Sequence, residues 1–329
     1  MISTIPAEEL AIATDFVVAH RAAFPPEKVI ETYRCHGLGL VQEPDSPELV
    51  AMIRAALDAQ IPYSVVRIGD GEANLLTYLR YSGTPQLDRL IARAIIEGQA
   101  DRFNANDLWL LCLRELMQLS IASADVVGVR GFWWGRSAPQ AQRSSSQIER
   151  VVVARQINAD PRGTLGVSRA ADAMLKLAAS SDLKGKTIAS AHLYLAILEG
   201  LDVLISAAQR VLLITNRIEL VVRLQQRWPE KHLELIEVGR SASTPSGKRP
   251  LKSPKFLDQV HSQLPQELGG ALCLVGAGPW SEIYCTFIKQ NGGVGIDLGS
   301  GFDLMDRVIS RPIHRALGLD QDNRFAIHP

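Results

Sequence analysis

Short apolar runs alternate with longer amphipathic stretches along most of this chain. Seven runs rich in β-branched residues are predicted as strands: Ser64–Ile68, Asp125–Val129, Thr187–Ser190, Val211–Thr215, Leu233–Val238, Leu272–Val275 and Val294–Leu298. Most are continuously apolar, which is typical of strands covered on both faces. Helical patterns of about 10 to 15 residues separate them, as in βαβ units. The pattern therefore predicts an α/β fold with a mostly parallel sheet flanked by helices.

The N-terminal part of the chain lacks such strand-like runs and is predicted to be helical. Helix-start signals occur at Pro6 and Pro47, each followed by acidic residues. We therefore expect a helical N-terminal segment over residues 1–58, an α/β domain over residues 59–315 and a C-terminal tail over residues 316–329.

Charge and composition narrow the classes of function. The 329 residues include 35 Lys plus Arg and 35 Asp plus Glu, so the chain has no basic excess and is not expected to bind nucleic acid. Hydrophobic residues make up 47% of the chain and charged residues 21%, as in ordinary globular proteins.

The cysteines and the N-terminus indicate the cellular compartment that is expected for the protein. The four cysteines show no C-x-x-C spacing, and Cys112 and Cys273 lie in apolar runs, so both are expected to be reduced core residues. No apolar run approaches the roughly 20 residues that span a bilayer. The N-terminus has acidic residues and no basic region, so no secretory signal is expected. These features predict a cytoplasmic protein without a transmembrane segment; peripheral membrane association and oligomer formation stay open.

The candidate chemistry is concentrated where the first predicted strand ends, in Gly69-Asp70-Gly71-Glu72. Ligands of open α/β sheets bind outside the carboxyl ends of strands. Two carboxylates spaced i, i+2 on a tight turn can converge on one hard cation, and Arg67 offers donors to a phosphate. Asp-Gly is also ordinary turn chemistry, in which Asp70 would only cap the next helix.

A second glycine turn follows the strand at Leu272. The sequence Gly276-Ala277-Gly278 leads into a helical pattern, and Asp297 lies about 20 residues downstream, as in dinucleotide sites. This is a Rossmann-like βαβ unit, but Pro279 follows the second glycine and Ser281 stands at the third glycine position. A lone G-x-G is a weak signal, so an enzyme dependent on NAD(P) or S-adenosylmethionine is kept as an alternative.

With both turns in view, the chain resembles the bacterial GT-D-type glycosyltransferases, which have a Rossmann-like fold. The resemblance rests on VVRIGDGE (Val65–Glu72) and LVGAGPWSEIYCTFIKQNGGVGIDLGSGFD (Leu274–Asp303). In that family the D-x-E pair binds a divalent metal and the nucleotide diphosphate of a sugar donor. The resemblance therefore implies that Asp70 and Glu72 bind Mn²⁺ or Mg²⁺ and act in catalysis.

Other residues are expected in the same site, and several of them have more than one candidate role. Arg67, Gly69, Gly71, Gly276 and Gly278 are expected to hold the phosphate or ribose of the donor.

Four polar residues complete the candidate set. Asp297 and Asp303 are predicted either to bind a hydroxyl, to act as a base or to cap helices. His192 directly follows a predicted strand and is either a base, a sugar ligand or a structural residue. Asn216 is either a phosphate or ribose contact or a cap.

Two segments are weaker candidates. Trp133 and Trp134 either stack on an acceptor sugar or pack in the core. The loop over residues 239–254, rich in Ser, Pro and basic residues, is either a lid or a solvated connection.

The sequence thus predicts a metal-dependent glycosyltransferase of polysaccharide biosynthesis. It would move a sugar from a nucleotide-diphosphate donor to a glycan, lipid-linked or protein acceptor. A non-catalytic nucleotide-sugar-binding protein is the other alternative, because a retained binding site has the same residues as a catalytic one.

Overall fold

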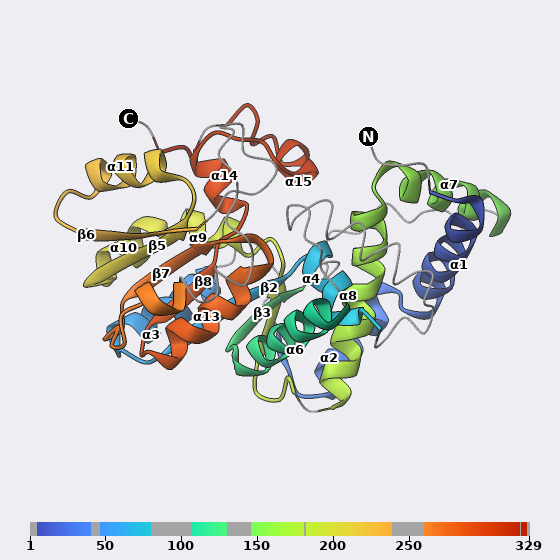
Figure 1. Ribbon diagram of the computed structural model, residues 1–329, viewed down its shortest axis with the longest axis horizontal. Helices are drawn as coiled ribbons and strands as arrows, with labels where there is room; N and C mark the ends of the chain where they lie inside the picture. The colour runs from blue at the N-terminus through green and yellow to red at the C-terminus, as the bar shows by residue number, and fades with distance from the viewer. Residues whose placement is uncertain are drawn as a thin grey trace. The chain divides into compact units, whose positions relative to one another are not determined.

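The computed structural model describes residues 5–40, 47–79, 107–129, 146–180, 182–238, 260–322 and 324–327 (Figure 1). Within these ranges the chain forms an α/β fold in which helices flank one eight-stranded sheet. The strands are β1 (Gly39–Leu40), β2 (Tyr63–Ile68), β3 (Val126–Val129), β4 (Thr187–Ser190), β5 (Arg210–Thr215), β6 (His232–Glu237), β7 (Leu272–Gly276) and β8 (Val294–Asp297).

The helices of the described ranges occupy the connections between strands. They are α1 (Ala7–Ala23), α2 (Pro26–Cys35), α3 (Pro47–Asp58), α4 (Asp70–Thr77), α6 (Asp107–Ser123), α7 (Ser146–Ala159), α8 (Pro161–Ala179), α9 (Tyr194–Glu199), α10 (Leu201–Ala207), α11 (Ile218–Arg227), the 3₁₀ turn η1 (Gly278–Trp280), α13 (Ser281–Gln290), α14 (Gly301–Met305) and α15 (Pro312–Ala316).

The strand order is β1-β4-β3-β2-β8-β7-β5-β6, and the ladders between β1 and β4, β2 and β8, β8 and β7, β7 and β5, and β5 and β6 are parallel. This confirms the predicted α/β fold, and all seven predicted strands form within a residue or two of their expected ends. The eighth strand, β1, lies in the segment expected to be wholly helical. Two residues are too short for a periodic signal, and β1 exists through its pairing of Gly39 with Thr187.

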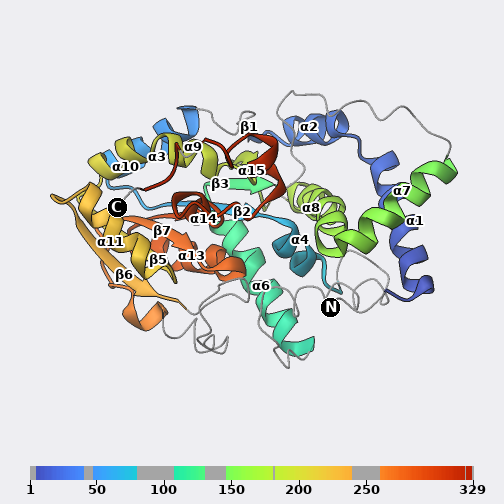
Figure 2. The same cartoon turned by 90° about the horizontal axis from the view of Figure 1, so that it is seen from above.

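Continuous apolar runs place the central strands in the core. In β5 and β7 the side chains over residues 211–214 and 272–275 are at most 1% exposed. Helices cover this part of the sheet. α13 packs on β7 and β8, and α11 packs on β6 (Figures 1 and 2). Such burial on both faces explains why the runs are continuous rather than alternating.

The chain divides into two compact units. The first unit comprises residues 1–43, 67–122 and 127–191, and the second comprises residues 44–66, 123–126 and 192–329. In the first unit α8 packs against α1, α2, α4 and α7. In the second, α3 packs against α9 and α10. The domain boundaries expected near residues 58 and 315 stay predictions.

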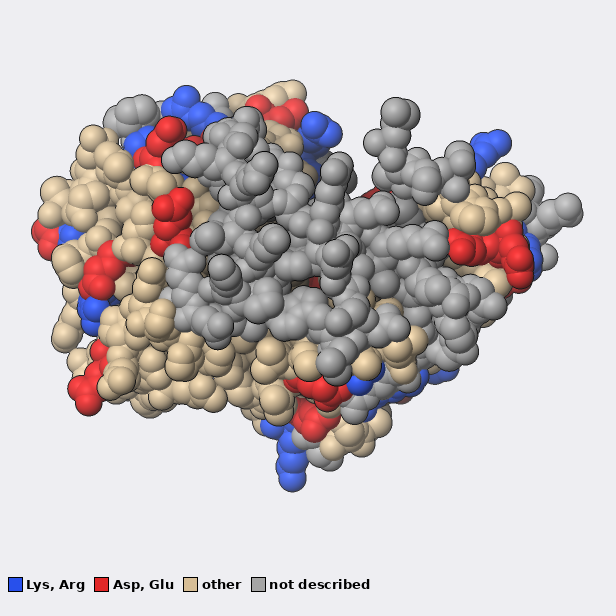
Figure 3. All heavy atoms as spheres, viewed as in Figure 1, with Lys and Arg blue, Asp and Glu red and all other residues tan. Residues whose placement is uncertain are grey.

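The surface and the cysteines add three observations. All four cysteines, each within the described ranges, are free thiols; Cys273 is buried, but Cys112 is exposed, which corrects its expected core position. The reason is the phase of α6, whose buried residues Leu110, Leu113 and Met117 occupy another face of the helix. Charged side chains of both signs are interspersed over the described residues visible in Figure 3. Among the described helices, none is long and apolar enough to cross a bilayer.

Candidate functional site

Asp70 and Glu72 lie in the first turn of α4, directly after β2. The apolar residues of β2 are buried, whereas Gly69, Asp70 and Glu72 are half-buried at the end of that strand. Gly69 precedes the helix with an extended backbone, and both carboxylates lie in the first helical turn. A helix N-terminus favours negative charge there, which stabilises the ionised form of both groups.

The helical conformation separates the two carboxylates. Residues spaced i, i+2 on an α-helix point about 200° apart and do not face each other. Glu72 instead turns back toward Gly69, where its Oε2 lies 2.6 Å from the position that a Cβ would take on that glycine. A shared metal at Asp70 and Glu72 therefore stays a prediction with a geometric condition: direct ligation by one carboxylate leaves the other to act through water.

A glycine of α8 packs against Asp70. A Cβ on Gly166 would lie 2.6 Å from the Cα, the Cβ and the backbone oxygen of Asp70, so only glycine permits this approach. One turn further along α8, the guanidinium of Arg169 is 1% exposed and donates through Nε to Oγ1 of Thr77 in α4. These contacts fix the helix that carries the carboxylates (Figure 2).

Arg67, the predicted phosphate ligand of β2, is half-buried. Its Nη1 donates to the backbone carbonyl of Ala191 at 3.2 Å, and the amide of Ala191 donates to the carbonyl of Val129 at 3.1 Å. Part of the Arg67 fork is thus used to join β2 to the end of β4. Gly71, in the same turn, is buried.

In the second unit, the glycine turn Gly276–Gly278 connects β7 to η1. A Cβ on Gly276 would lie 2.4 Å from the ring of Phe302, which occupies that space. Gly278 has φ +61 and no atom near its Cβ position, so it is a glycine for conformational reasons. The amide of Ala277 donates to Oγ of buried Ser281 at 3.0 Å. Serine at the third glycine position therefore uses the amide of Ala277, which lies between the two glycines expected to hold a phosphate.

Asn216 and Asp297 lie at the carboxyl ends of β5 and β8, the two strands that flank β7 in the sheet. Thr215 pairs with Gly276 across β5 and β7, and Val275 pairs with Asp297 across β7 and β8. Asp297 is only 1% exposed, whereas Asn216 is half-buried. Both positions agree with the expectation that polar side chains follow the strands here.

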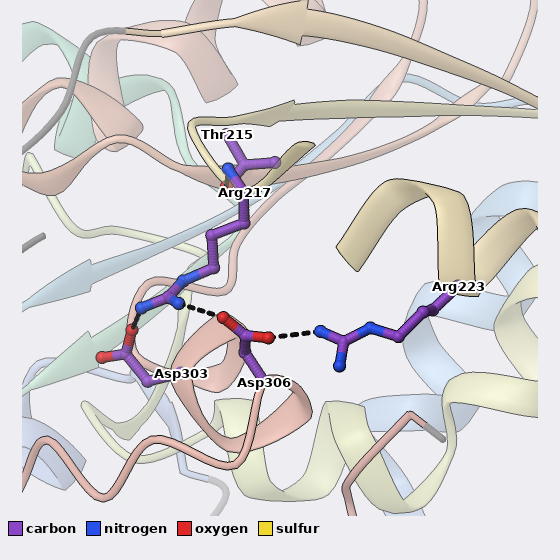
Figure 4. A network of polar contacts seen from close by, with 5 residues as sticks. All are labelled: Thr215, Arg217, Arg223, Asp303 and Asp306. Atoms are coloured by element: carbon purple, nitrogen blue, oxygen red, sulfur yellow. Dashed lines mark hydrogen bonds and ion pairs between the residues drawn. The ribbon is translucent and has the colours of Figure 1, made fainter. Parts of the chain in front are cut away.

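Asp303 belongs to a network of ion pairs (Figure 4). Arg217, two residues after the end of β5, pairs with both Asp303 and Asp306, and Asp306 also pairs with Arg223 of α11. The side chains are about one-fifth to one-quarter exposed, so the pairs are partly shielded from water. Asp303 thus already accepts from a guanidinium, which suits a role in holding Arg217.

His192, the predicted histidine, contacts a buried tyrosine. Oη of Tyr194 lies 3.4 Å from Nδ1 of His192 and 2.9 Å from Nε2 of His314 in α15. Burial lowers the pKa of His314 to about 4; Asp303 acts in the opposite direction and Arg311 in the same direction. His192 itself is half-buried.

The structure thus distributes the predicted site residues over both units. Those of the first unit are Arg67, Gly69, Asp70, Gly71 and Glu72; those of the second are His192, Asn216, Gly276, Gly278, Asp297 and Asp303. Trp133, Trp134 and the loop 239–254 lie outside the described residues.

Sequence reasoning missed three buried ionisable residues: Arg169, Glu282 and His314 are each at most 1% exposed. Glu282 is the second residue of α13, and its charge directly before the run Ile283–Cys285 was the available signal.

Oxygen donors at the start of α4 suit a hard divalent cation. Mg²⁺ keeps several waters and is usually bound by one or two carboxylates together with substrate phosphates, so Asp70 and Glu72 fit it by donor type and number. Within the described ranges no group of three or more His, Cys, Asp or Glu side chains is clustered for a metal.

Comparison with known protein families finds a match for part of the chain. Residues 45–160 match the model of the GT-D fold-like domain, and this range includes β2, the Asp70–Glu72 turn and α4. The segment Leu274–Asp303, which also resembles that family, lies outside the matched range. A comparison with curated proteins finds no match, and a comparison with solved structures finds none. The match over residues 45–160 therefore supports a GT-D-type family assignment.

Proposed function

We propose that this protein is a metal-dependent glycosyltransferase that moves a sugar from a nucleotide-diphosphate donor to a glycan, lipid-linked or protein acceptor. The match of residues 45–160 to the GT-D fold-like domain carries the proposal, because that range contains the only D-x-E turn that follows a buried strand among the described residues. The GT-D-like domain itself suggests a glycosyltransferase-type family.

The chemistry assigned to the first unit is charge neutralisation. Transfer from a nucleotide sugar leaves a diphosphate whose negative charge grows as the C–O bond breaks. A bound Mn²⁺ or Mg²⁺ supplies Lewis-acid stabilisation of that leaving group. Asp70 and Glu72 would hold the ion, one of them through water, and the Arg67 guanidinium would donate to phosphate oxygens.

The second unit has its own polar groups after β5, β7 and β8. Asp297 is the buried carboxylate we assign to a ribose or sugar hydroxyl, or to the acceptor proton. Asp303 holds Arg217 and so acts through it, with the guanidinium and Asn216 as phosphate or ribose contacts. The open backbone at Gly278 permits close approach of a ligand.

Calorimetry with nucleotide sugars tests the proposal. The protein is titrated with UDP-, GDP-, CMP- and dTDP-sugars, each with and without Mn²⁺, and donor hydrolysis is measured in parallel. We expect one donor to bind in a metal-dependent way, and Asp70→Asn and Glu72→Gln to weaken that binding. Asp58→Asn, an exposed carboxylate of α3 paired with Arg54, is the matched control and should bind like the wild type.

Other outcomes would point elsewhere. Metal-independent binding of NAD(P) or S-adenosylmethionine, lost in Gly278→Val, would replace the transferase proposal with the alternative enzyme. The Phe302 ring over Gly276 and the Ser281 contact of Ala277 count against that alternative, because both use space or donors that a dinucleotide needs. Metal-dependent binding without any turnover would instead indicate a nucleotide-sugar-binding protein.

A further inference from the structure

A tyrosine bridges two histidines in the second unit. Tyr194, the first residue of α9, is 1% exposed, and its hydroxyl lies between Nδ1 of His192 and Nε2 of His314. Both imidazoles meet the tyrosine ring edge-on, with interplanar angles of 81° and 78°. The residues come from the end of β4, from α9 and from α15, so the arrangement depends on tertiary structure.

His314, the buried histidine of this His192–Tyr194–His314 group, sets the direction of the hydrogen bonds. His314 is 0% exposed, and its Nδ1 has no hydrogen-bond partner among the described residues. A neutral imidazole has one N–H and one lone pair. Orphaned buried N–H groups are rarer than under-satisfied acceptors, so the proton belongs on Nε2, where it is donated to Tyr194.

The direction of the first hydrogen bond affects the second one, between Tyr194 and His192. If Tyr194 accepts from His314 and directs its own O–H to Nδ1 of His192, at the longer distance of 3.4 Å, that Nδ1 is an acceptor. The proton of the neutral His192 ring then lies on Nε2. A neutral imidazole with its proton on Nε2 donates a hydrogen bond there and cannot remove a proton with the same atom.

We propose that Tyr194 and His314 are positioning residues that hold His192 as a neutral hydrogen-bond donor, so that His192 binds an oxygen of the substrate instead of acting as a base. This choice between ligand and base rests on the proposed glycosyltransferase function, in which the oxygen belongs to a phosphate or a sugar hydroxyl. The protonation pattern itself is a property of the folded chain and does not depend on that function.

The electrostatics of His314 support the arrangement. Its pKa is lowered to about 4 by burial, so the ring is neutral near neutral pH and has one proton to donate. The charged groups that act on it are Asp303, which favours the imidazolium, and Arg311, which opposes it. Burial is the largest of these effects and decides the outcome.

Nuclear magnetic resonance of the ¹⁵N-labelled imidazoles tests the proposal. In the wild type near neutral pH we expect both His192 and His314 to have a protonated Nε2, and Nδ1 of His192 to be unprotonated and hydrogen-bonded, with a preference of about tenfold or more over the other tautomer. In Tyr194→Phe the ¹⁵N signal of that Nδ1 should move to the position of an unbonded ring nitrogen. Tyr284→Phe removes another fully buried tyrosine hydroxyl and is the control that should leave His192 unchanged.

Two results would overturn the proposal: a proton on Nδ1 of His192 in the wild type, or an unchanged Nδ1 signal in Tyr194→Phe. His314→Gln keeps a donor for Tyr194 and should preserve the wild-type pattern at His192, whereas His314→Leu should not. Because the wild-type spectrum alone decides the tautomer, a variant that fails to fold leaves the test intact.

Substrate binding is examined separately by adding UDP with Mg²⁺. If the tautomer is as expected and the Nε2 signal of His192 does not respond to UDP, His192 does not contact the nucleotide part of a donor and the ligand role proposed for a phosphate oxygen is refuted. If the tautomer is as expected but no nucleotide sugar binds at all, the proposed function fails while the positioning of His192 stands.

Discussion

Buried His314 predicts a specific loss of stability in mild acid. The pKa of this histidine is about 4 in the folded protein against an ordinary value of 6.5, and the cause is burial. Between these two values the unfolded chain binds a proton that the folded chain does not. Stability is therefore complete above the unfolded pKa and falls as the pH is lowered toward the folded pKa.

The size of the effect follows from the two pKa values. From about pH 7.5 down to about pH 5, the linkage relation gives a loss of about 2 kcal/mol from this group alone. The mutation that isolates it is His314→Gln, which cannot titrate. We expect the wild type to lose about 2 kcal/mol more than the variant over this range, whatever the absolute stability of the variant.

Urea unfolding at a series of pH values measures this difference. The histidine His20, whose pKa is also lowered by burial, contributes to the wild type and to the variant alike and cancels in the comparison. His36→Gln, at an exposed position, is the matched control. Parallel curves for the wild type and His314→Gln would refute the reasoning, because they would mean that His314 binds protons equally in both states.

Three packing and charge contacts give further predictions. Gly166→Ala should destabilise the fold by about 1 kcal/mol in urea unfolding, because overpacking against Asp70 costs about 1–3 kcal/mol and helix propensity returns about 1 kcal/mol; a variant more stable than the wild type would contradict the close approach. Gly276→Ala should cost about 1–3 kcal/mol through the ring of Phe302, and adding Phe302→Leu should recover most of that loss in the same assay. Asp306→Asn should cost about 1 kcal/mol at low salt and less at high salt, since it removes two partly exposed ion pairs; a salt-independent cost would argue against an electrostatic origin.

The sequence was sufficient for seven of the eight described strands and for the position of the D-x-E turn. Apolar β-branched runs bounded by turn residues predict buried strands because both faces of a parallel sheet are covered. β2 ends at Ile68, directly before Gly69, where the turn was predicted. The helical state of Asp70 was not predicted, since Gly-Asp-Gly suggests a turn when taken alone. Its helix is held by α8, and the contact with Gly166 joins residues far apart in sequence.

The partners of the candidate residues were beyond sequence reasoning for the same reason. Asp303 could be assigned to a hydroxyl because nothing local indicates that Arg217 pairs with it. The Gly276 position resembles a phosphate loop, but the space that glycine provides is filled by Phe302. Tyr194 bridges to His314 across 120 residues, a contact that exists only in the folded chain.

The position of Asp70 and Glu72 in one helical turn also determines how metal and nucleotide should bind together. Side chains about 200° apart on a helix do not jointly enclose an ion, so the protein offers few direct ligands and phosphate oxygens must complete the coordination. We therefore expect Mn²⁺ alone to bind weakly and a nucleoside diphosphate to strengthen it. By linkage, Mn²⁺ must strengthen nucleotide binding by the same factor.

Paired calorimetric titrations check this reciprocity: Mn²⁺ into protein with and without UDP, and UDP into protein with and without Mn²⁺. Asp70→Asn should reduce the coupling factor, since it removes the carboxylate that both titrations share, and Asp58→Asn should leave it unchanged. Tight Mn²⁺ binding whose affinity is the same with and without UDP would mean that the protein supplies a complete set of ligands. The ion would then be held elsewhere than at the start of α4, and the metal-diphosphate site would have to be abandoned even if the chain transfers sugars.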